Sequence, residues 1–269
     1  MSIDRSVLLK SVQNSRELGG YPAAGGKRVK SGVLLRTANL SSITPEDIQI
    51  LKDRYRVSDI IDFRMEMEKT GFEDPVIDGI CNTHLDVIDF SDMDSEGMSD
   101  VDMSKLDIVQ LVEMSEKIGM LSGDMYIGFL ENDKGKDAYA RFFRILLSAD
   151  PDKAVLWHCT SGKDRTGLAA MLILSVLGTE ESVIMEDYLL TNEYNAQRIA
   201  GTKQFLKAKG CDDDFVEKAV LVFDAVDRRF METVMEYLKK KYGSVLGYIR
   251  SELNISGEEM AALKEKYTV

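Results

Sequence analysis

The sequence predicts an α/β protein with a central, mostly parallel sheet of four to five strands flanked by helices, and with a helical C-terminal section. Three observations lead to this prediction. Short apolar runs typical of buried strands recur up to residue 158, a helix-forming stretch separates the first two runs, and helical patterns follow one another beyond Gly178. A strand, a helix and another strand in close succession are typical of a parallel sheet with helices on its faces.

Four segments carry the strand pattern: residues 32–36, 57–63, 81–87 and 154–158. Between the first two, Thr44 precedes Pro45, Glu46 and Asp47. Threonine is a good N-cap, proline is favoured at the first helical position, and acids stabilise a first turn. We therefore expect a helix to begin at Pro45.

The segment from about 91 to 123 differs from the rest of the chain. It opens with small and acidic residues and is rich in methionine, which favours an insertion or lid beside the sheet. Methionine more often fills irregular packing than contacts substrate, although a substrate-contacting lid is the alternative. Helices are expected through Ile108 to Met114 and from Ala138 to Leu147.

The chain from about 179 to 269 is expected to be helical. Thr179 and the two glutamates after it open one helix, and a second runs from Met231 to Tyr242 and closes at Gly243. A capping box at 256–259 opens a third. Because no Pro-rich or Ser-rich linker separates this section from the sheet, we expect residues 1–269 to form a single domain.

Composition narrows the class of protein. The 269 residues are 44% hydrophobic and 30% charged, which is typical of a globular protein, and no apolar run is long enough to span a bilayer. The N-terminus lacks a secretory signal, so a cytoplasmic protein is expected, with signal-less export as the alternative. A net charge of -12 disfavours nucleic-acid partners and stable membrane insertion. Oligomeric state is not indicated.

Cysteine and histidine usage gives no sign of a metal or disulfide framework. Cys81, Cys159 and Cys211 are widely spaced and odd in number, and the chain has only two histidines, His84 and His158. Neither set has the spacing of metal ligands. We therefore expect no metal and no cofactor.

The chemistry is expected in the loop that follows the fourth strand. It reads His158-Cys159-Thr160-Ser161-Gly162-Lys163-Asp164-Arg165-Thr166-Gly167. A cysteine six residues before an arginine is weak evidence by itself. Here an apolar strand precedes the loop and an apolar helix follows it, the arrangement in which main-chain N–H groups and a helix N-terminus face a bound anion.

Each residue type in this loop suits phosphate-ester chemistry. The phosphate-binding residues are expected to be Thr160, Ser161, Gly162, Lys163, Asp164 and Arg165. Arg165 adds a planar fork that matches two phosphate oxygens. A helix N-terminus and a neighbouring cation stabilise a thiolate, which makes Cys159 the expected nucleophile. Thr166 can donate its hydroxyl to the sulfur, and His158 is expected to orient the loop.

The loop resembles the signature of the atypical bacterial tyrosine phosphatases, some of which also hydrolyse phosphoinositides. Other segments are similar to that family too: residues 14–21 with 35–40, the strand end at 61–64, residues 187–190, and residues 242–248. The resemblance implies a parallel sheet wrapped by helices, phosphatase activity through a phosphocysteine intermediate, and no cofactor or metal.

The leaving group still needs a proton donor. The only tryptophan, Trp157, lies inside a predicted strand, so the Trp-Pro-Asp loop of better-known tyrosine phosphatases is absent. The resemblance implies Asp164 as the donor, with a bracing role as the alternative. Asp62, Asp86 and Asp89 are rival acids at strand ends, and Arg64 is a candidate substrate contact.

Lys163 bears on the substrate class. A second cation in the loop favours substrates with several phosphates, such as phosphoinositides, whereas a lysine that is solvated or paired with Asp164 leaves phosphotyrosine proteins as the expected substrate. Two further alternatives remain. One is a non-catalytic module that binds phosphorylated ligands, and the other is a rhodanese-like sulfur transferase.

Overall fold

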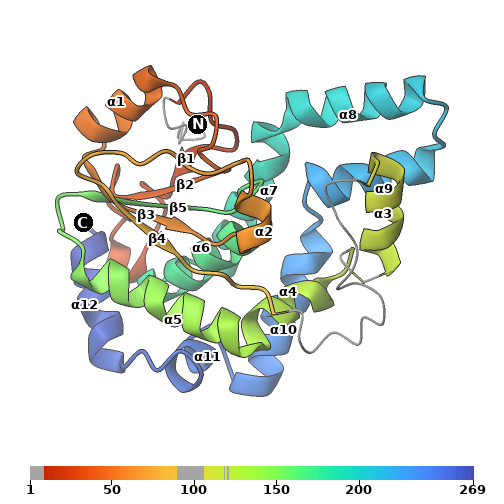
Figure 1. Cartoon of the computed structure of the whole chain (residues 1–269). Helices are drawn as coiled ribbons and strands as arrows, with labels where there is room; N and C mark the ends of the chain where they lie inside the picture. Colours follow the sequence, from red (N-terminus) through yellow and green to blue (C-terminus); the bar gives the residue numbers. More distant parts are fainter. Residues whose placement is uncertain (1–8, 90–105, 118, 120) are drawn as a thin grey trace.

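The computed structural model describes residues 9–89, 106–117, 119 and 121–269, and its centre is a five-stranded sheet in the order β1-β2-β5-β3-β4 (Figure 1). The strands are β1 Arg16–Glu17, β2 Leu34–Thr37, β3 Val57–Asp62, β4 Cys81–His84 and β5 Ala154–His158. All neighbouring pairs are parallel except β1 with β2, which is antiparallel. The mostly parallel sheet predicted from the sequence is confirmed, and the four predicted strands are β2, β3, β4 and β5.

The helices follow the predicted pattern. They are α1 Pro45–Asp53, α2 Glu66–Lys69, α3 Ile108–Lys117, α4 Gly123–Glu131, α5 Asp133–Ser148, α6 Asp164–Leu177, α7 Glu181–Tyr194, α8 Ala196–Ala208, α9 Asp213–Phe223, α10 Arg228–Tyr242, α11 Val245–Ser251 and α12 Gly257–Tyr267, with a short 3-10 turn at Ala24–Gly26. Thr44 caps α1 as predicted, and Gly243 ends α10 in the left-handed conformation. The capping box of α12 at Ser256 is also confirmed.

Both faces of the central strands β2 and β5 are buried, as expected for parallel strands, whereas the edge strand β4 is partly exposed. Along β5, Leu156 joins an apolar cluster with Leu51 of α1, while Trp157 joins the larger cluster that includes Leu168 of α6. Figure 1 accordingly shows α1 on one side of the sheet and α5, α6 and α12 on the other. This two-sided packing holds β5 at the centre of the sheet, and therefore also holds the loop that follows it.

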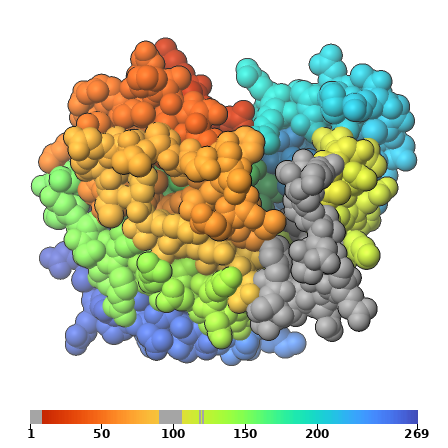
Figure 2. All heavy atoms as spheres, in the orientation of Figure 1, coloured from red at the N-terminus to blue at the C-terminus, as the bar shows by residue number. Residues whose placement is uncertain are grey.

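Helices α8 and α9 form an antiparallel pair beside the sheet, which we call the arm (residues 196–223). The arm has a small apolar core of its own, in which Leu206, Val216 and Ala219 pack with Val112 of α3. Figure 1 shows the arm and α3 together at one side of the molecule, and Figure 2 shows the surface hollowed between the arm and the segment that contains α2.

Parts of the predicted insertion at 91–123 lie outside the described residues; the helix expected through Ile108 to Met114 is α3. The helix expected from Ala138 to Leu147 is the second half of α5, which begins earlier, at Asp133. In the described ranges, no helix is both long enough and apolar enough to cross a membrane.

Candidate active site

The loop 158–167 lies at the carboxyl edge of the sheet, where β2, β3 and β5 all end. Its tight turn depends on Gly162, whose φ is +65°. A Cβ at this position would overlap the carbonyl group of Thr37 at the end of β2. Glycine is therefore needed both for the positive φ and for the close approach of two backbones.

Three carbonyl groups of the loop are held from outside. The Thr160 carbonyl accepts hydrogen bonds from the main chain and side chain of Asn39, at 3.2 and 2.9 Å. The carbonyl of Gly162 accepts from Asn14 Nδ2 at 2.8 Å and from Arg36 at 2.9 Å, and Asn14 also donates to the Ser161 carbonyl at 3.2 Å. The outer side of the loop is thus fixed by residues from the N-terminal segment and β2.

This anchoring decides where the N–H groups point. In a trans peptide the N–H points opposite to the C=O, so outward carbonyls at 160, 161 and 162 turn the N–H groups of residues 161–163 inward. The first turn of α6 leaves further N–H groups without helical partners. Among the described residues, no acceptor is present for the N–H groups of residues 160–165. The loop is therefore a ring of unsatisfied donors suited to an anion.

Cys159 begins this ring and is 1% exposed. The Thr166 hydroxyl, at the base of α6, is buried and has no hydrogen-bond partner in the described part of the chain, the Cys159 sulfur included. Its predicted bond to the sulfur is thus not formed in this structure, but its hydroxyl is left available.

Arg165 is held by a glutamate that the sequence analysis did not identify. Its two terminal nitrogens bind the two carboxylate oxygens of Glu68, at 2.6 and 2.7 Å, and one of them also donates to the Phe63 carbonyl at 3.1 Å. Glu68 also accepts from the Thr160 hydroxyl and from the N–H of Met65. This network leaves Nε of Arg165 without an acceptor among the described residues, available for a ligand.

The charge of Glu68 is set by this pair. Burial by itself would raise the pKa of Glu68, but the charge and hydrogen bonds of Arg165, with those of Thr160 and Met65, outweigh it and lower the pKa to about 2. Glu68 is therefore ionised at neutral pH and orients the guanidinium of Arg165.

Asp164 is the first residue of α6, and its carboxylate lies between the Tyr126 hydroxyl and the Lys163 ammonium. Its Oδ1 accepts a hydrogen bond from the Tyr126 hydroxyl, which is also 2.8 Å from the Tyr188 hydroxyl, and its Oδ2 lies 3.4 Å from Nζ of Lys163. Burial and the neighbouring carboxylate raise the pKa of Tyr126 well above its usual value, so this phenol remains a donor. The Asp164 side chain is 20% exposed, so it can reach a ligand in the loop.

The Lys163 side chain is directed to the arm. Its ammonium donates to the carbonyls of Leu221, at 2.7 Å, and Ala225, at 3.2 Å. An ion pair with Asp164 at 3.4 Å adds to these two hydrogen bonds. Ser161 adds a weaker link, from its hydroxyl to the Phe223 carbonyl at 3.2 Å. The main chain of Lys163 stays in the loop, while its charge joins the loop to the end of the arm.

We predict that Lys163→Met loosens the end of the arm. The substitution removes two charge-assisted hydrogen bonds, each worth roughly 1.5 to 3 kcal/mol, so amide hydrogen exchange across 219–226 should accelerate. Turnover of a small aryl phosphate should fall less than about tenfold, because the ammonium faces carbonyl groups. Lys203→Met, which removes an exposed ion pair with Glu217 on the same arm, is the control. A loss of turnover above a hundredfold with unchanged exchange would contradict this role.

His158, Asp62 and Arg64 form a buried cluster with Asp74, which the sequence analysis did not identify. Arg64 binds Asp62 through Nε and one terminal nitrogen, and that terminal nitrogen also binds Asp74 at 2.8 Å. Its other terminal nitrogen donates to the Phe72 carbonyl. Arg64 is 1% exposed, so the predicted contact between Arg64 and substrate is not supported, and Asp62 is a brace for Arg64 rather than a free acid.

The same cluster has metal-ligating atoms close together. Oxygens of Asp62 and Asp74 and a ring nitrogen of His158 lie within 4.8 Å of one another. However, the Arg64 guanidinium already binds both carboxylates, and His158 Nε2 lies 2.9 Å from Asp74. The donor set is therefore that of an ion-pair network, and a second cation would compete with Arg64.

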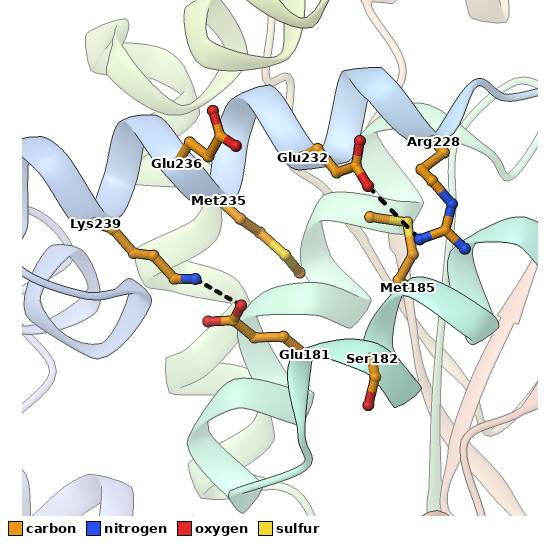
Figure 3. Close-up of a pocket in the computed structure, with 8 residues that line it drawn as sticks. All are labelled: Glu181, Ser182, Met185, Arg228, Glu232, Met235, Glu236 and Lys239. Carbon is orange, nitrogen blue, oxygen red and sulfur yellow. Dashed lines mark hydrogen bonds and ion pairs between the residues drawn. The ribbon is translucent and has the colours of Figure 1, made fainter.

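The two other rival acids lie elsewhere. Asp86 and Asp89 face Lys134, at 3.9 and 4.0 Å. Figure 3 shows a pocket of about 230 Å³ between α7 and α10, which contains two ion pairs, Lys239 with Glu181 and Arg228 with Glu232. No residue of the loop 158–167 lines this pocket. Of the predicted acids, Asp164 is the one that lies in the loop and keeps an exposed edge.

Together, the fold and the loop define an α/β protein with an anion-binding loop at the carboxyl end of its sheet. A family model described as the tyrosine phosphatase family matches residues 7–269. The chain belongs to the tyrosine phosphatase family, and phosphatase activity is the function that this membership supports.

Comparisons with known proteins found the following three relatives and one solved structure, among others. A protein of Cupriavidus necator named as a tyrosine-protein phosphatase is 28% identical over 96% of this chain and 86% of its own length. A tyrosine-protein phosphatase of Nostoc commune is 24% identical over 90% of this chain and 76% of its own. The triple specificity protein phosphatase PtpB of Mycobacterium tuberculosis is 28% identical over 47% of this chain and 48% of its own. P. aeruginosa TpbA, solved as a serine variant in complex with phosphotyrosine, covers 78% of this chain and 90% of its own, with 13% identity and a TM-score of 0.29.

Proposed function

We propose that the protein hydrolyses phosphotyrosine in proteins through a phosphocysteine intermediate. The observation that carries the proposal is a loop with a buried cysteine at its start, inward N–H groups, and an arginine whose Nε is free while its terminal nitrogens are held by Glu68. A phosphoryl group needs several convergent donors, which this ring supplies, and it needs a nucleophile below it, which is Cys159.

The reaction proceeds in two displacements. In the first, the Cys159 thiolate attacks phosphorus, a sulfur–phosphorus bond forms, the bond from phosphorus to the ester oxygen breaks, and Asp164 donates a proton to the departing phenol oxygen. In the second, water attacks phosphorus, the sulfur–phosphorus bond breaks, and Asp164 takes a proton from that water. Arg165 and the loop N–H groups stabilise the charge on the equatorial oxygens in both steps. The Thr166 hydroxyl can stabilise the leaving thiolate.

The substrate class follows from the direction of Lys163. A second phosphate on the substrate would need a free cation near the loop, but the Lys163 ammonium is bound to Leu221 and Ala225. This favours phosphotyrosine over a phosphoinositide. The triple specificity in the name of the M. tuberculosis relative is the reason to measure both classes.

A panel of matched substrates tests this preference. We expect kcat/KM for a phosphotyrosyl peptide to exceed that for a soluble inositol polyphosphate or a dispersed phosphoinositide by at least about tenfold. The reverse order would assign the enzyme to inositol phosphates. Tight binding of phosphate esters without turnover would favour a non-catalytic binding module, and sulfur transfer from thiosulfate would favour a rhodanese-like enzyme.

We predict that Asp164→Asn slows esters of poor leaving groups most. General acid catalysis contributes typically 10² to 10⁴, so kcat for an alkyl phosphate or for phosphotyrosine should fall by about that factor. Esters of acidic phenols, which need little protonation, should lose much less. Tyr126→Phe, which removes one hydrogen bond to Asp164 but no acid, is the matched control. Equal slowing of all esters would exclude Asp164 as the proton donor.

A further inference from the structure

Two fully buried arginines lie directly behind the catalytic loop. Arg16 of β1 and Arg36 of β2 are neighbours in the sheet register, and both are 0% exposed. Asp187 of α7 lies between them, with its Oδ1 3.1 Å from Nε of Arg16 and its Oδ2 2.6 Å from a terminal nitrogen of Arg36. All three residues lie in segments that resemble the family, and their sequence pattern indicates no role for them.

This set carries one more positive charge than it has negative charge. Asp187 is the carboxylate that both guanidinium groups share, and its remaining neighbour, the Tyr21 hydroxyl, is a neutral donor. Nε of Arg36 is buried without a hydrogen-bond partner among the described residues. Burying an uncompensated charge costs several kcal/mol, so a fold that retains one has an anion close by.

The geometry indicates where that anion is. The terminal nitrogen of Arg36 that does not bind Asp187 donates to the Gly162 carbonyl at 2.9 Å, inside the catalytic loop. Arg16 reaches the same carbonyl indirectly, because it binds the side-chain oxygen of Asn14, whose nitrogen donates to Gly162. The guanidinium of Arg36 also packs close to Gly167 in the first turn of α6. The excess charge thus lies against the outer side of the ring that begins at Cys159, where the Gly162 carbonyl points.

The other charged groups around the ring have local partners. Arg165 is paired with Glu68, Lys163 lies beside Asp164, and Arg64 is shared by Asp62 and Asp74. The charged and titratable groups around Cys159 are therefore Lys163, Asp164, Arg165, Glu68, His158, Asp62, Arg64, Asp74, Tyr139, Arg16, Arg36 and Asp187. Within this set, the Arg16–Asp187–Arg36 triad is the one with a net positive charge.

We infer that Arg36, held by Asp187, is a positioning residue that supplies the positive charge stabilising the Cys159 thiolate and the phosphate bound above it. The inference rests on the proposed function, since it assigns a role in the same site. Burial, first, and the neighbouring Arg16, second, lower the pKa of Arg36 to about 10, so this guanidinium is still charged at neutral pH. It acts through the loop and does not touch the reacting atoms.

The test is the pH dependence of alkylation of Cys159 by iodoacetamide, followed by mass spectrometry of the peptide that contains it, in the full-length protein. In Arg36→Gln the midpoint of this dependence should rise by about one pH unit, which is about tenfold less thiolate on the acid side. The kcat/KM for an aryl phosphate should therefore fall more at pH 5.5 than at pH 8. Arg36→Lys keeps the positive charge, so its alkylation midpoint and its kcat/KM should stay close to the wild-type values.

A second substitution, expected to shift the alkylation midpoint in the opposite direction, separates an electrostatic effect from a loss of stability. Asp187→Asn leaves two positive charges and no carboxylate, so it should lower the alkylation midpoint even if it weakens the fold. Tyr21→Phe, which removes a neutral donor to Asp187, should reduce the free energy of unfolding without moving the midpoint. The inference is overturned if Arg36→Gln and Asp187→Asn share the wild-type midpoint while turnover persists. If the wild-type protein has no turnover, the proposed function fails instead.

Discussion

Cys159→Ser is expected to reduce turnover of an aryl phosphate by at least about a thousandfold. A serine hydroxyl is almost fully protonated at neutral pH, so it is a much weaker nucleophile than the thiolate that it replaces. The loop donors and Arg165 remain, so binding of phosphate or of a phosphotyrosyl peptide should be retained. Turnover and binding should therefore separate in this variant, which can be measured by initial rates and by calorimetry on the same preparation.

The other cysteines provide matched controls. Cys81 is exposed on β4, and Cys211 lies at the arm. Serine at either position removes a thiol without changing the loop, so both variants should keep at least half of the wild-type rate. If Cys159→Ser retained the wild-type rate, or if Cys81→Ser lost it, Cys159 would not be the nucleophile.

Arg165→Met is expected to have the second large effect, on both activity and stability. Loss of one transition-state donor typically costs 10² to 10³ in kcat, and Arg165 supplies Nε as such a donor, while Glu68 holds its two terminal nitrogens. The variant also leaves the half-buried Glu68 carboxylate, whose side chain is 20% exposed, without its cation, so the free energy of unfolding should fall. The double variant Arg165→Met with Glu68→Gln removes that unpaired charge, so it should recover stability while remaining inactive.

The pH dependence of this stability has a definite sign. The folded-state pKa of Glu68 is lowered from 4.5 to about 2, so the pair contributes stability above about pH 4.5 and loses it as the pH falls towards 2. The stability difference between wild type and Arg165→Met should therefore be largest at neutral pH and shrink below about pH 4.5. Urea unfolding of both proteins at pH 7 and at pH 4 measures this stability difference.

Recovery of activity in the double variant Arg165→Met with Glu68→Gln would contradict the role of Arg165 in catalysis.

The parts of the site that could be predicted from the sequence are those encoded locally. Strand β5, the loop and α6 are contiguous, so an apolar run, a polar turn with Gly162 and a second apolar run were sufficient to place Cys159 and Arg165. The caps at Thr44 and Ser256 were predictable for the same reason, because each cap lies within four residues of the group it satisfies.

The parts that could not be predicted depend on contacts between distant segments. Glu68 lies 97 residues from Arg165 along the chain, in a helix of four residues with no signal of its own. The direction of Lys163 depends on where α9 ends, 58 residues later. The buried charges of Arg16 and Arg36 could not be foreseen either, since arginine at a strand end is usually exposed and β1 spans only two residues.

The most direct test of the central claim is to identify the covalent intermediate. The wild-type protein is mixed with an aryl phosphate, quenched in acid within the first turnover, digested, and analysed by mass spectrometry and phosphorus NMR. We expect one phosphoryl group on the peptide that contains Cys159, bonded to sulfur, appearing and decaying at rates compatible with turnover. A phosphoryl group on another residue, or a complete first turnover during which Cys159 stays unmodified, would contradict it.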